Sequence, residues 1–450
     1  MACAAPDTRD IPGTPELLKV ILVERLPEDG TRVLNHFLEG PKEGAGENSH
    51  VLEFSGWVLG VAQDVAHVAL HLEGFEEEDL DIGQLAVERP RPDVRAAFPA
   101  ARPQACGYQG SIALWGREQT LVYRLLAVFD DGARVPLYRI TIRHGALGSA
   151  QTLLKPLLVT TLGRSGSMLL TMLLGSHPEI RAYKPGKYEA RVCTYWTDMF
   201  LTLCQPRRYL QALTANDASP RDWWLDDKLP AGTSVCAATA GYLARDGIDA
   251  LVDFARARVD GFYRACGGTE GGRAPRYFVE KCVCRLTRLA ILSVFPGARE
   301  ILLVRDLRDM LCSILAYNRK IGRVKFRREL VATDVEYVRT LRVEADRMLH
   351  ALRFSQPRPI LLRYEDLILQ PDRTLRGLLT ELNLDASDAV IEGLLAGRSQ
   401  DVFAVHGTSR DPASSIGRWR GELDAEMRAA CREHFAGALA ELGYAPTEPD

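Results

Sequence analysis

Residues 157–174, LLVTTLGRSGSMLLTMLL, constrain the fold of this chain more than any other stretch. The first five are apolar or β-branched, which predicts a buried strand. The strand ends at Gly163, and a polar turn over residues 164–167 leads into residues 168–174, whose composition predicts a buried helix. A strand, a glycine-bearing turn and a helix in this order bring unpaired backbone N–H groups and the positive end of a helix dipole to one point. The sequence therefore predicts an anion-binding loop.

The residues of this turn favour a phosphate ligand without magnesium. Gly163 and Gly166 allow the backbone to approach a phosphate closely. Arg164 adds a guanidinium group that stays charged, and Ser165 and Ser167 add hydroxyl groups. The ATPase loop GxxxxGK[ST] needs a Lys-Ser/Thr pair, which is missing here, and its glycine spacing is longer. A metal-free phosphate or phosphosulfate ligand therefore fits better, although a Gly/Ser turn can also be purely structural.

The charge of the chain is unevenly distributed. Its 450 residues are enough for two or three domains, and 46% hydrophobic with 26% charged residues is ordinary for a globular protein. Residues 1–150 hold 14 Lys and Arg against 22 Asp and Glu, whereas the remaining residues hold 42 against 37. The half with the anion loop is thus the basic half, as expected for a protein that binds a highly charged nucleotide.

The start of the chain, MACAAPDTRDIPGTPE, lacks the basic and apolar regions of a signal peptide. Residues 157–174 are nearly long enough to span a membrane, but Arg164 and the glycines interrupt the apolar run. The ten cysteines are scattered, without the spacing of a zinc site. We therefore expect a cytoplasmic protein with buried free thiols, no integral membrane segment and no metal site.

Two different patterns divide the chain. Residues 1–15 are rich in Pro, Ala, Thr and Asp, which predicts a disordered N-terminus. Residues 16–145 have the β pattern of an all-β, sandwich-like accessory domain, including a hairpin around Asp130-Asp131-Gly132. The expected strands include residues 50–60, 65–72, 119–129 and 134–143. Residues 146–156 are expected to form a linker.

Strands alternate with helices in the remainder, residues 157–446. The strands are expected at residues 157–162, 276–282, 300–304 and 359–364, and helices at 285–294, 309–317, 372–382 and 422–442. Apolar runs such as ILLV and ILLR are typical of fully buried parallel strands. This pattern predicts an α/β domain with a three-layer, P-loop-like parallel sheet and a ligand at the carboxyl ends of its strands.

A second candidate anion site lies in residues 300–313, EILLVRDLRDMLCS. Arg305 ends a predicted strand, and Ser313 follows eight residues later on the next helix. An arginine leaving a sheet and a helical serine can clamp a phosphate. Such a turn alone is more often a structural ion-pair cluster, but together with GRSGS upstream it favours a binding function.

With these motifs together, the C-terminal two-thirds of the chain resembles the PAPS-dependent sulfotransferases, which use 3′-phosphoadenosine 5′-phosphosulfate (PAPS). The matching segments are TTLGRSGSMLLTMLLGSHPEI, FVEKCVCRLTRLAILSVFPGAREILLVRDLRDMLCS, LLRYEDLILQP and HGTSRDPASSIGRWRGEL. The resemblance implies that residues 164–167 hold the 5′-phosphosulfate, and that Arg305 and Ser313 hold the 3′-phosphate. It places Tyr364 near the adenine, with Arg418 and Trp419 closing over the 3′ side. The implied nucleotide-binding set is Gly163, Arg164, Ser165, Gly166, Ser167, Met168, Arg305, Ser313, Tyr364, Arg418 and Trp419.

Two residues depart from the family pattern. Met168 stands where a second hydroxyl residue often follows such a loop, which removes a side-chain donor but keeps the backbone N–H. Leu307 replaces the proline often found in RDPRD, which is expected only to soften the turn.

Sulfuryl transfer needs a base for the acceptor proton and cations for the leaving phosphate, but requires no metal when the acceptor attacks in line. The resemblance to the carboxylate-base branch, such as the protein-tyrosine sulfotransferases with ExRV, implies that Glu189 is the base and Arg191 its partner. His177 is a rival base that we interpret as a loop–helix cap. The resemblance also implies that Lys281 is a catalytic cation, which would stabilise the bridging oxygen of the leaving phosphate, and we expect Arg164 to be a second one.

The acceptor is expected to be a small molecule or a glycan, and not a nucleic acid. Its determinants should lie in the segments without the family pattern, about 191–275 and 317–345. The first contains Trp196, Trp223 and Trp224, which suit a sugar or aromatic ring but equally a protein core. The second contains a run of cations between residues 319 and 328, which suits an anionic acceptor or simply a solvated face.

The sequence therefore predicts a bacterial-type sulfotransferase with a β-rich accessory domain. Two alternatives stay open at this point. One is an ATP-dependent, kinase-like P-loop enzyme, and the other is a non-catalytic nucleotide-binding or glycan-binding module. The identity of the acceptor and the oligomeric state are not determined by these patterns.

Overall fold

The computed structural model of the chain describes residues 16–27, 30–47, 50–73, 81–99, 105–114, 119–204, 247–266, 274–283, 286–396, 408–409 and 411–445. The chain divides into two compact units. The first comprises residues 1–150, 196–256 and 289–296, and the second comprises residues 151–195, 257–288 and 297–450. The predicted disordered segment 1–15, Trp223 and Trp224 lie outside the described residues.

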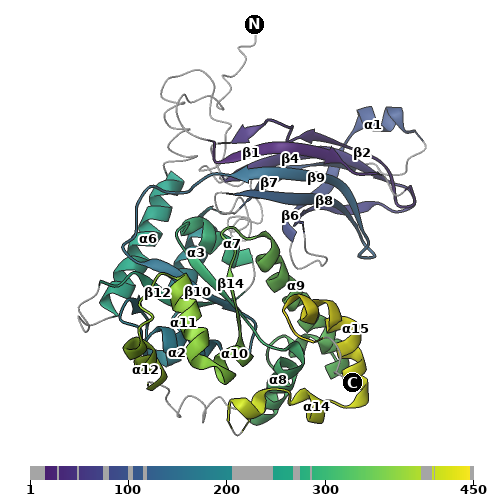
Figure 1. Cartoon of the computed structure of the whole chain (residues 1–450). Helices are drawn as coiled ribbons and strands as arrows, with labels where there is room; N and C mark the ends of the chain where they lie inside the picture. The colour runs from purple at the N-terminus through teal and green to yellow at the C-terminus, as the bar shows by residue number, and fades with distance from the viewer. Residues whose placement is uncertain are drawn as a thin grey trace. The chain divides into compact units, whose positions relative to one another are not determined.

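The first unit contains an antiparallel sheet in the strand order β2-β4-β7-β6-β5-β8-β9-β1-β3 (Figure 1). Its strands are β1 (Leu18–Arg25), β2 (Val33–Gly40), β3 (Gly46–Glu47), β4 (Val51–Gly60), β5 (Val65–Leu72), β6 (Asp81–Pro90), β7 (Ala105–Ala113), β8 (Thr120–Phe129) and β9 (Arg134–His144). A short helix, α1 (Pro92–Ala97), follows β6. Because β4 and β7 also contact β5, the sheet folds back over itself. The predicted antiparallel β region is confirmed.

The hairpin between β8 and β9 has the predicted turn. Gly132 has φ 81°, a conformation that glycine adopts without strain, and the Asp131 carboxylate accepts a hydrogen bond of 3.0 Å from the N–H of Ala133. Ile140 and Ile142 on β9 are fully buried, whereas Arg143 is exposed. The alternation of apolar and polar residues thus fixes which face of this strand packs inward.

The second unit contains a parallel sheet in the order β11-β12-β10-β13-β14. Its strands are β10 (Lys155–Thr161), β11 (Ile180–Arg181), β12 (Tyr277–Val283), β13 (Arg299–Val304) and β14 (Ile360–Arg363). Its helices are α2 (Ser167–Leu174), η2 (Pro185–Tyr188), α8 (Leu307–Ile321), η4 (Arg328–Leu330), α9 (Asp334–Phe354), α10 (Tyr364–Leu369), α11 (Pro371–Glu381), α12 (Asp388–Ala396), η5 (Ala413–Ser415), α14 (Trp419–Glu422) and α15 (Ala425–Glu441). Three helices have residues in both units: α3 (Val192–Cys204), α6 (Gly247–Ala265) and α7 (Leu286–Val294).

Helices cover both faces of this sheet, as the apolar runs predicted. Leu303 and its neighbours on one face pack with α2, α10, α11 and α12. Leu302 and Val304, which point to the opposite face, pack with α8, α9 and α15 (Figure 1). Since successive residues of β13 are buried on alternate faces, its continuous run ILLV is explained. The predicted three-layer α/β fold is confirmed.

The parallel arrangement brings all five strand ends to one edge of the sheet. β10 leads into the glycine loop, β13 ends next to Arg305, and β14 ends next to Tyr364. Lys281 lies near the end of β12, and η2 with Glu189 follows β11. The fold thus gathers residues that are far apart in the sequence.

Among the described residues, no helix is both long enough and apolar enough to cross a lipid bilayer. Cys106, Cys193, Cys312 and Cys431 are buried free thiols, as the scattered cysteine spacing predicted, whereas Cys266 is only half-buried.

A buried ion pair crosslinks α7 and β13 in the second unit. Arg288 Nε donates to Glu300 Oε1 at 2.5 Å, and both side chains are at least 96% buried, with exposures of 3% and 4%. Arg288 also donates to Ser355 Oγ at 2.6 Å, and Thr160 donates to Glu300. These additional hydrogen bonds help to compensate for the burial of the two charges.

We predict that Arg288→Met lowers the free energy of unfolding by about 3–5 kcal/mol, because it leaves the Glu300 carboxylate buried without its cation. The double variant Arg288→Met/Glu300→Met should recover most of this loss. Urea denaturation at pH 7, followed by fluorescence, measures both. A single variant as stable as the wild type would contradict the prediction.

Candidate active site

The glycine loop between β10 and α2 is held from within by hydroxyl groups. Ser165, which is only 1% exposed, donates to the carbonyl of Leu162 at 2.8 Å and lies against the Thr161 hydroxyl. Thr161 in turn donates to the carbonyl of Leu303 on β13 at 2.9 Å. The Ser165 hydroxyl therefore fastens the loop, whereas Ser167 lines the cavity.

Both loop glycines are required by aromatic rings that approach the backbone. A Cβ atom added at Gly163 would lie under 3.0 Å from the ring of Phe326, and one at Gly166 would lie as close to the ring of Tyr364. Gly166 also has φ 89°, which disfavours any residue with a side chain. The sequence analysis explained these glycines by the approach of a phosphate, and the structure adds two close-packed rings.

The N-terminus of α2 opens toward the cavity. No side chain of the described residues caps this helix, and its first internal backbone bond joins the N–H of Leu170 to the carbonyl of Gly166. The side chains of Ser167 and Met168 line the cavity next to this end. The first-turn N–H groups and the helix dipole therefore favour an anion here.

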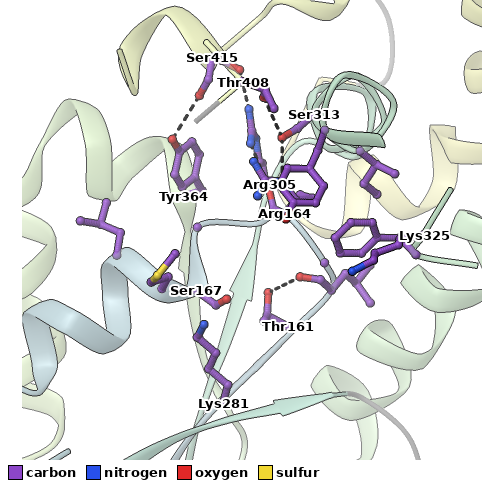
Figure 2. Close-up of a pocket in the computed structure, with 18 of the residues that line it drawn as sticks. Thr161, Arg164, Ser167, Lys281, Arg305, Ser313, Lys325, Tyr364, Thr408 and Ser415 are labelled. Atoms are coloured by element: carbon purple, nitrogen blue, oxygen red, sulfur yellow. Dashed lines mark hydrogen bonds between the residues drawn. The ribbon is translucent and has the colours of Figure 1, made fainter. Parts of the chain in front are cut away.

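The loop lines one cavity of about 620 Å³ together with residues from the other strand ends (Figure 2). It brings together most of the predicted site residues: Gly163, Arg164, Gly166, Ser167, Met168, Glu189, Arg191, Lys281, Arg305, Ser313 and Tyr364. Ser165, Arg418 and Trp419 lie outside this lining.

Arg305 is buried at one end of the cavity, with an exposure of 5%. Its guanidinium donates to the carbonyls of Arg164 at 3.1 Å and Ser415 at 2.6 Å, and lies 4.7 Å from the centre of the Tyr364 ring. Its Nε is buried without a hydrogen-bond partner among the described residues. A buried guanidinium with a donor left over fits an anionic group.

The side chain of Arg164 lies beside Ser313, its Nε 3.4 Å from the serine Oγ (Figure 2). Its guanidinium stacks 4.5 Å from the centre of the Tyr317 ring. Burial lowers the pKa of Arg164, and the nearby charge of Arg305 acts in the same direction. The sequence analysis assigned this side chain to the 5′-phosphosulfate, whereas in the structure it faces the group assigned to the 3′-phosphate.

Arg418 and Trp419 lie outside the cavity lining and contact residues in it or next to it. Arg418 donates to the Thr408 hydroxyl at 2.9 Å, and the Trp419 ring lies 4.0 Å from the Arg308 guanidinium. The buried carboxylate of Asp309 accepts hydrogen bonds from the N–H groups of Gly417 and Trp419. Burial raises the pKa of Asp309 to about 6. This end of the site is therefore fixed to the first turns of α8.

Lys281 and Glu189 form an ion pair at the other end, with Lys281 Nζ 2.9 Å from Glu189 Oε1. The lysine side chain is 10% exposed and the glutamate side chain 55%. His177 is buried, and its Nδ1 accepts from the N–H of Glu179 at 3.1 Å. Its Nε2 lies 3.0 Å from the carbonyl oxygen of Asp385, so both ring nitrogens of His177 contact the backbone.

Glu280 anchors the segment that carries Glu189 and Arg191. Its carboxylate accepts from the N–H groups of Cys193 at 2.9 Å and Thr194 at 3.2 Å, and from the Tyr263 hydroxyl at 2.8 Å. It thus caps the first turn of α3 from the strand that also bears Lys281. Burial raises the pKa of Glu280 to about 7. The sequence analysis missed Glu280. The only signal for it was its position next to Lys281 in the sequence.

Tyr317, Phe326, Thr408 and Ser415 are among the further lining residues that were not predicted. Ser415 and Thr408 lie in a segment already matched to the family pattern, so a signal for them existed. Tyr317 and Phe326 lie in the segment without such a pattern and are brought in only by tertiary packing.

A family model described as "Sulfotransferase family" matches residues 156–388, more than half of the chain. The chain belongs to the sulfotransferase family. The matched range includes the glycine loop, Glu189, Lys281, Arg305 and Ser313. A comparison with curated protein sequences finds no match.

Several solved sulfotransferase structures are similar to this chain. The sulfotransferase STF9 from Mycobacterium avium is 15% identical over 65% of this chain and 78% of that chain, with a TM-score of 0.35. The sulfotransferase domain from the curacin biosynthetic pathway is 16% identical over 65% of this chain and 99% of its own, with a TM-score of 0.37. Mouse SULT7A1, in complex with PAP, is 10% identical over 65% and 85%, with a TM-score of 0.35.

We predict a pH-dependent stability difference between the wild type and Glu280→Gln. Burial raises the pKa of Glu280 from its usual 4.5 to about 7, so the folded state holds this proton more tightly than the unfolded chain. Its contribution is therefore fully present below about pH 4.5 and is lost as the pH rises through 7.

The unfolding free energy of the wild type minus that of the variant should fall between roughly pH 5 and pH 8. Urea titrations at several pH values measure it. A difference that stays constant over this range would contradict the assignment.

Proposed function

We propose that this sulfotransferase moves a sulfuryl group from PAPS to the hydroxyl of a small-molecule or glycan acceptor. The observation that carries the proposal is the buried Nε of Arg305, which has no hydrogen-bond partner among the described residues. The Arg305 guanidinium donates to the carbonyl of Arg164, whose side chain lies beside Ser313. A second anion-binding feature, the open N-terminus of α2, lies in the same cavity. An adenosine nucleotide with a phosphate at each end matches two such sites.

In this proposal Arg305, Ser313 and Arg164 bind the 3′-phosphate. The backbone of residues 163–168 and the Ser167 hydroxyl bind the 5′-phosphosulfate. The Tyr364 ring, which packs on Gly166 and under Arg305, lies against the nucleotide. When bound, PAPS supplies the sulfuryl group and a phosphate as leaving group.

Glu189 takes the proton of the acceptor hydroxyl while the oxygen of that hydroxyl attacks the sulfur. Lys281 neutralises the bridging oxygen of the leaving phosphate as the sulfur–oxygen bond to that phosphate breaks. In the structure these two side chains form an ion pair, with Lys281 Nζ 2.9 Å from Glu189 Oε1. We further propose that residues 157–446 are the sulfotransferase domain and residues 16–145 an accessory domain.

We predict that the wild type binds PAP (3′-phosphoadenosine 5′-phosphate) in the presence of EDTA. It should prefer PAP to AMP, which lacks the 3′-phosphate, by about tenfold or more, because a charge-assisted hydrogen bond to that phosphate contributes roughly 1.5–3 kcal/mol. Arg305→Ala should lower the PAP affinity to about that of AMP while leaving the AMP affinity nearly unchanged, and Ser313→Ala should weaken the preference for PAP. Isothermal titration calorimetry measures both nucleotides.

Comparing the two nucleotides separates loss of the 3′-phosphate site from general damage to the loop. Loss of that site weakens only PAP binding, whereas general damage weakens the binding of both nucleotides. Strictly magnesium-dependent ATP turnover, without PAP binding in EDTA, would support the kinase-like alternative instead.

We predict that Glu189→Gln leaves PAP affinity nearly unchanged and lowers turnover of PAPS by roughly 10²–10⁴-fold, the usual contribution of a general base. Sulfuryl transfer from labelled PAPS to acceptors in cell extracts measures turnover. Glu433→Gln, an exposed glutamate on α15, is the matched control and should behave as the wild type.

Equal losses of binding and turnover in Glu189→Gln would show that the residue is structural. Absence of any transfer by the wild type over a broad acceptor panel would favour a non-catalytic binding module.

A further inference from the structure

Residues 325–327, which we call the Lys325 arch, combine backbone strain with a place in the cavity wall. Phe326 and Arg327 both have φ 65°, in the left-handed region that residues with side chains rarely adopt. All three residues of the arch line the cavity. Such strain persists only where the surroundings enforce it, and it is concentrated at functional sites.

Two buried side chains enforce this conformation. Asn318 on α8 donates through Nδ2 to the carbonyl of Lys325 and accepts from its N–H, each at 3.2 Å. Tyr337 on α9 donates its hydroxyl to the carbonyl of Phe326 at 2.5 Å. The arch is therefore an ordered part of the site that two helices hold in place.

The arch is fixed against the glycine loop. The Phe326 ring occupies the space where a side chain of Gly163 would lie. It also packs edge-on against the Tyr317 ring, with the ring centres 5.9 Å apart, and the Arg164 guanidinium stacks on the Tyr317 ring. Figure 2 shows the Lys325 side chain reaching into the cavity from the right of the view and Lys281 from the bottom.

The part of the cavity wall formed by the Lys325 arch is positively charged. Arg327 is paired with Glu344 at 3.3 Å, and that glutamate also pairs with Arg347. Within the part of the chain that the structure describes, neither Lys325 nor Arg191 forms an ion pair, although both line the cavity. The same lining includes apolar side chains, among them Phe326 and Leu341. A cation beside an apolar wall fits a ligand with an anionic group on an apolar or ring-shaped body.

We infer that the Lys325 arch is an acceptor subsite and that the acceptor carries an anionic group besides its hydroxyl. This inference rests on the proposed sulfuryl transfer and narrows its acceptor class. Lys325 binds the anion, Arg191 adds to the local potential, and Phe326 contacts the body of the acceptor. A carboxylate and a phosphate share this chemistry.

The test compares matched ligands on the full chain saturated with PAP. One pair is p-nitrophenyl β-D-glucuronide and p-nitrophenyl β-D-glucoside, and the other is glucose 6-phosphate and glucose. Dissociation constants are measured by calorimetry or ligand-observed NMR for the wild type, Lys325→Gln, Lys325→Arg and Arg323→Gln. Arg323 lies in the same basic run but outside the cavity lining, so it is the matched control.

At least one anionic ligand should bind the wild type about tenfold more tightly than its neutral partner. The ratio should approach one in Lys325→Gln and persist in Lys325→Arg and Arg323→Gln. Which pair discriminates tells a carboxylate acceptor from a phosphate one.

PAP affinity, measured in the same samples, reports separately on the proposed function. If the wild type does not bind PAP, the proposed function fails and the inference with it. If PAP binds but neither anion is preferred, or Lys325→Gln keeps the preference, only the acceptor subsite is wrong.

Discussion

The guanidinium of Arg305 is the group on which the arrangement of the site depends. It donates to the loop after β10 through the carbonyl of Arg164 and to the segment before α14 through that of Ser415. It also covers the ring of Tyr364 at the start of α10. One buried cation thus joins three segments that are far apart in the sequence. Because two carbonyls replace only part of its lost hydration, an anion at the remaining Nε donor would complete its environment.

The elements that were predicted from the sequence have a strong local signal. The apolar run before Gly163 and the runs ILLV and ILLR fixed three strands of the parallel sheet to within one or two residues. Arg305 was identified because it follows directly after such a strand, where parallel sheets bind their ligands. Tyr364 was assigned only from the resemblance to the family pattern. The hairpin around Gly132 was predicted for the same kind of reason, since its turn chemistry is local.

The features that escaped prediction depend on packing between distant segments. Nothing near Ser165 indicates that its hydroxyl turns inward to the carbonyl of Leu162. Phe326 carries no signal for a left-handed backbone, which is usually assigned to glycine or asparagine, because its conformation is enforced by Asn318 and Tyr337. The role of Glu280 as a cap of α3 likewise needs the strand and the helix to be placed first.

The contact between Phe326 and Gly163 links the glycine loop to the Lys325 arch. A change of shape at position 326 would therefore disturb the support of the loop, whereas a change of charge at position 325 leaves that packing intact. If the arch binds the acceptor as proposed, a change of acceptor, in evolution or by design, should arise first from a change of charge at position 325. A change in the shape of the side chain at position 326 should come later.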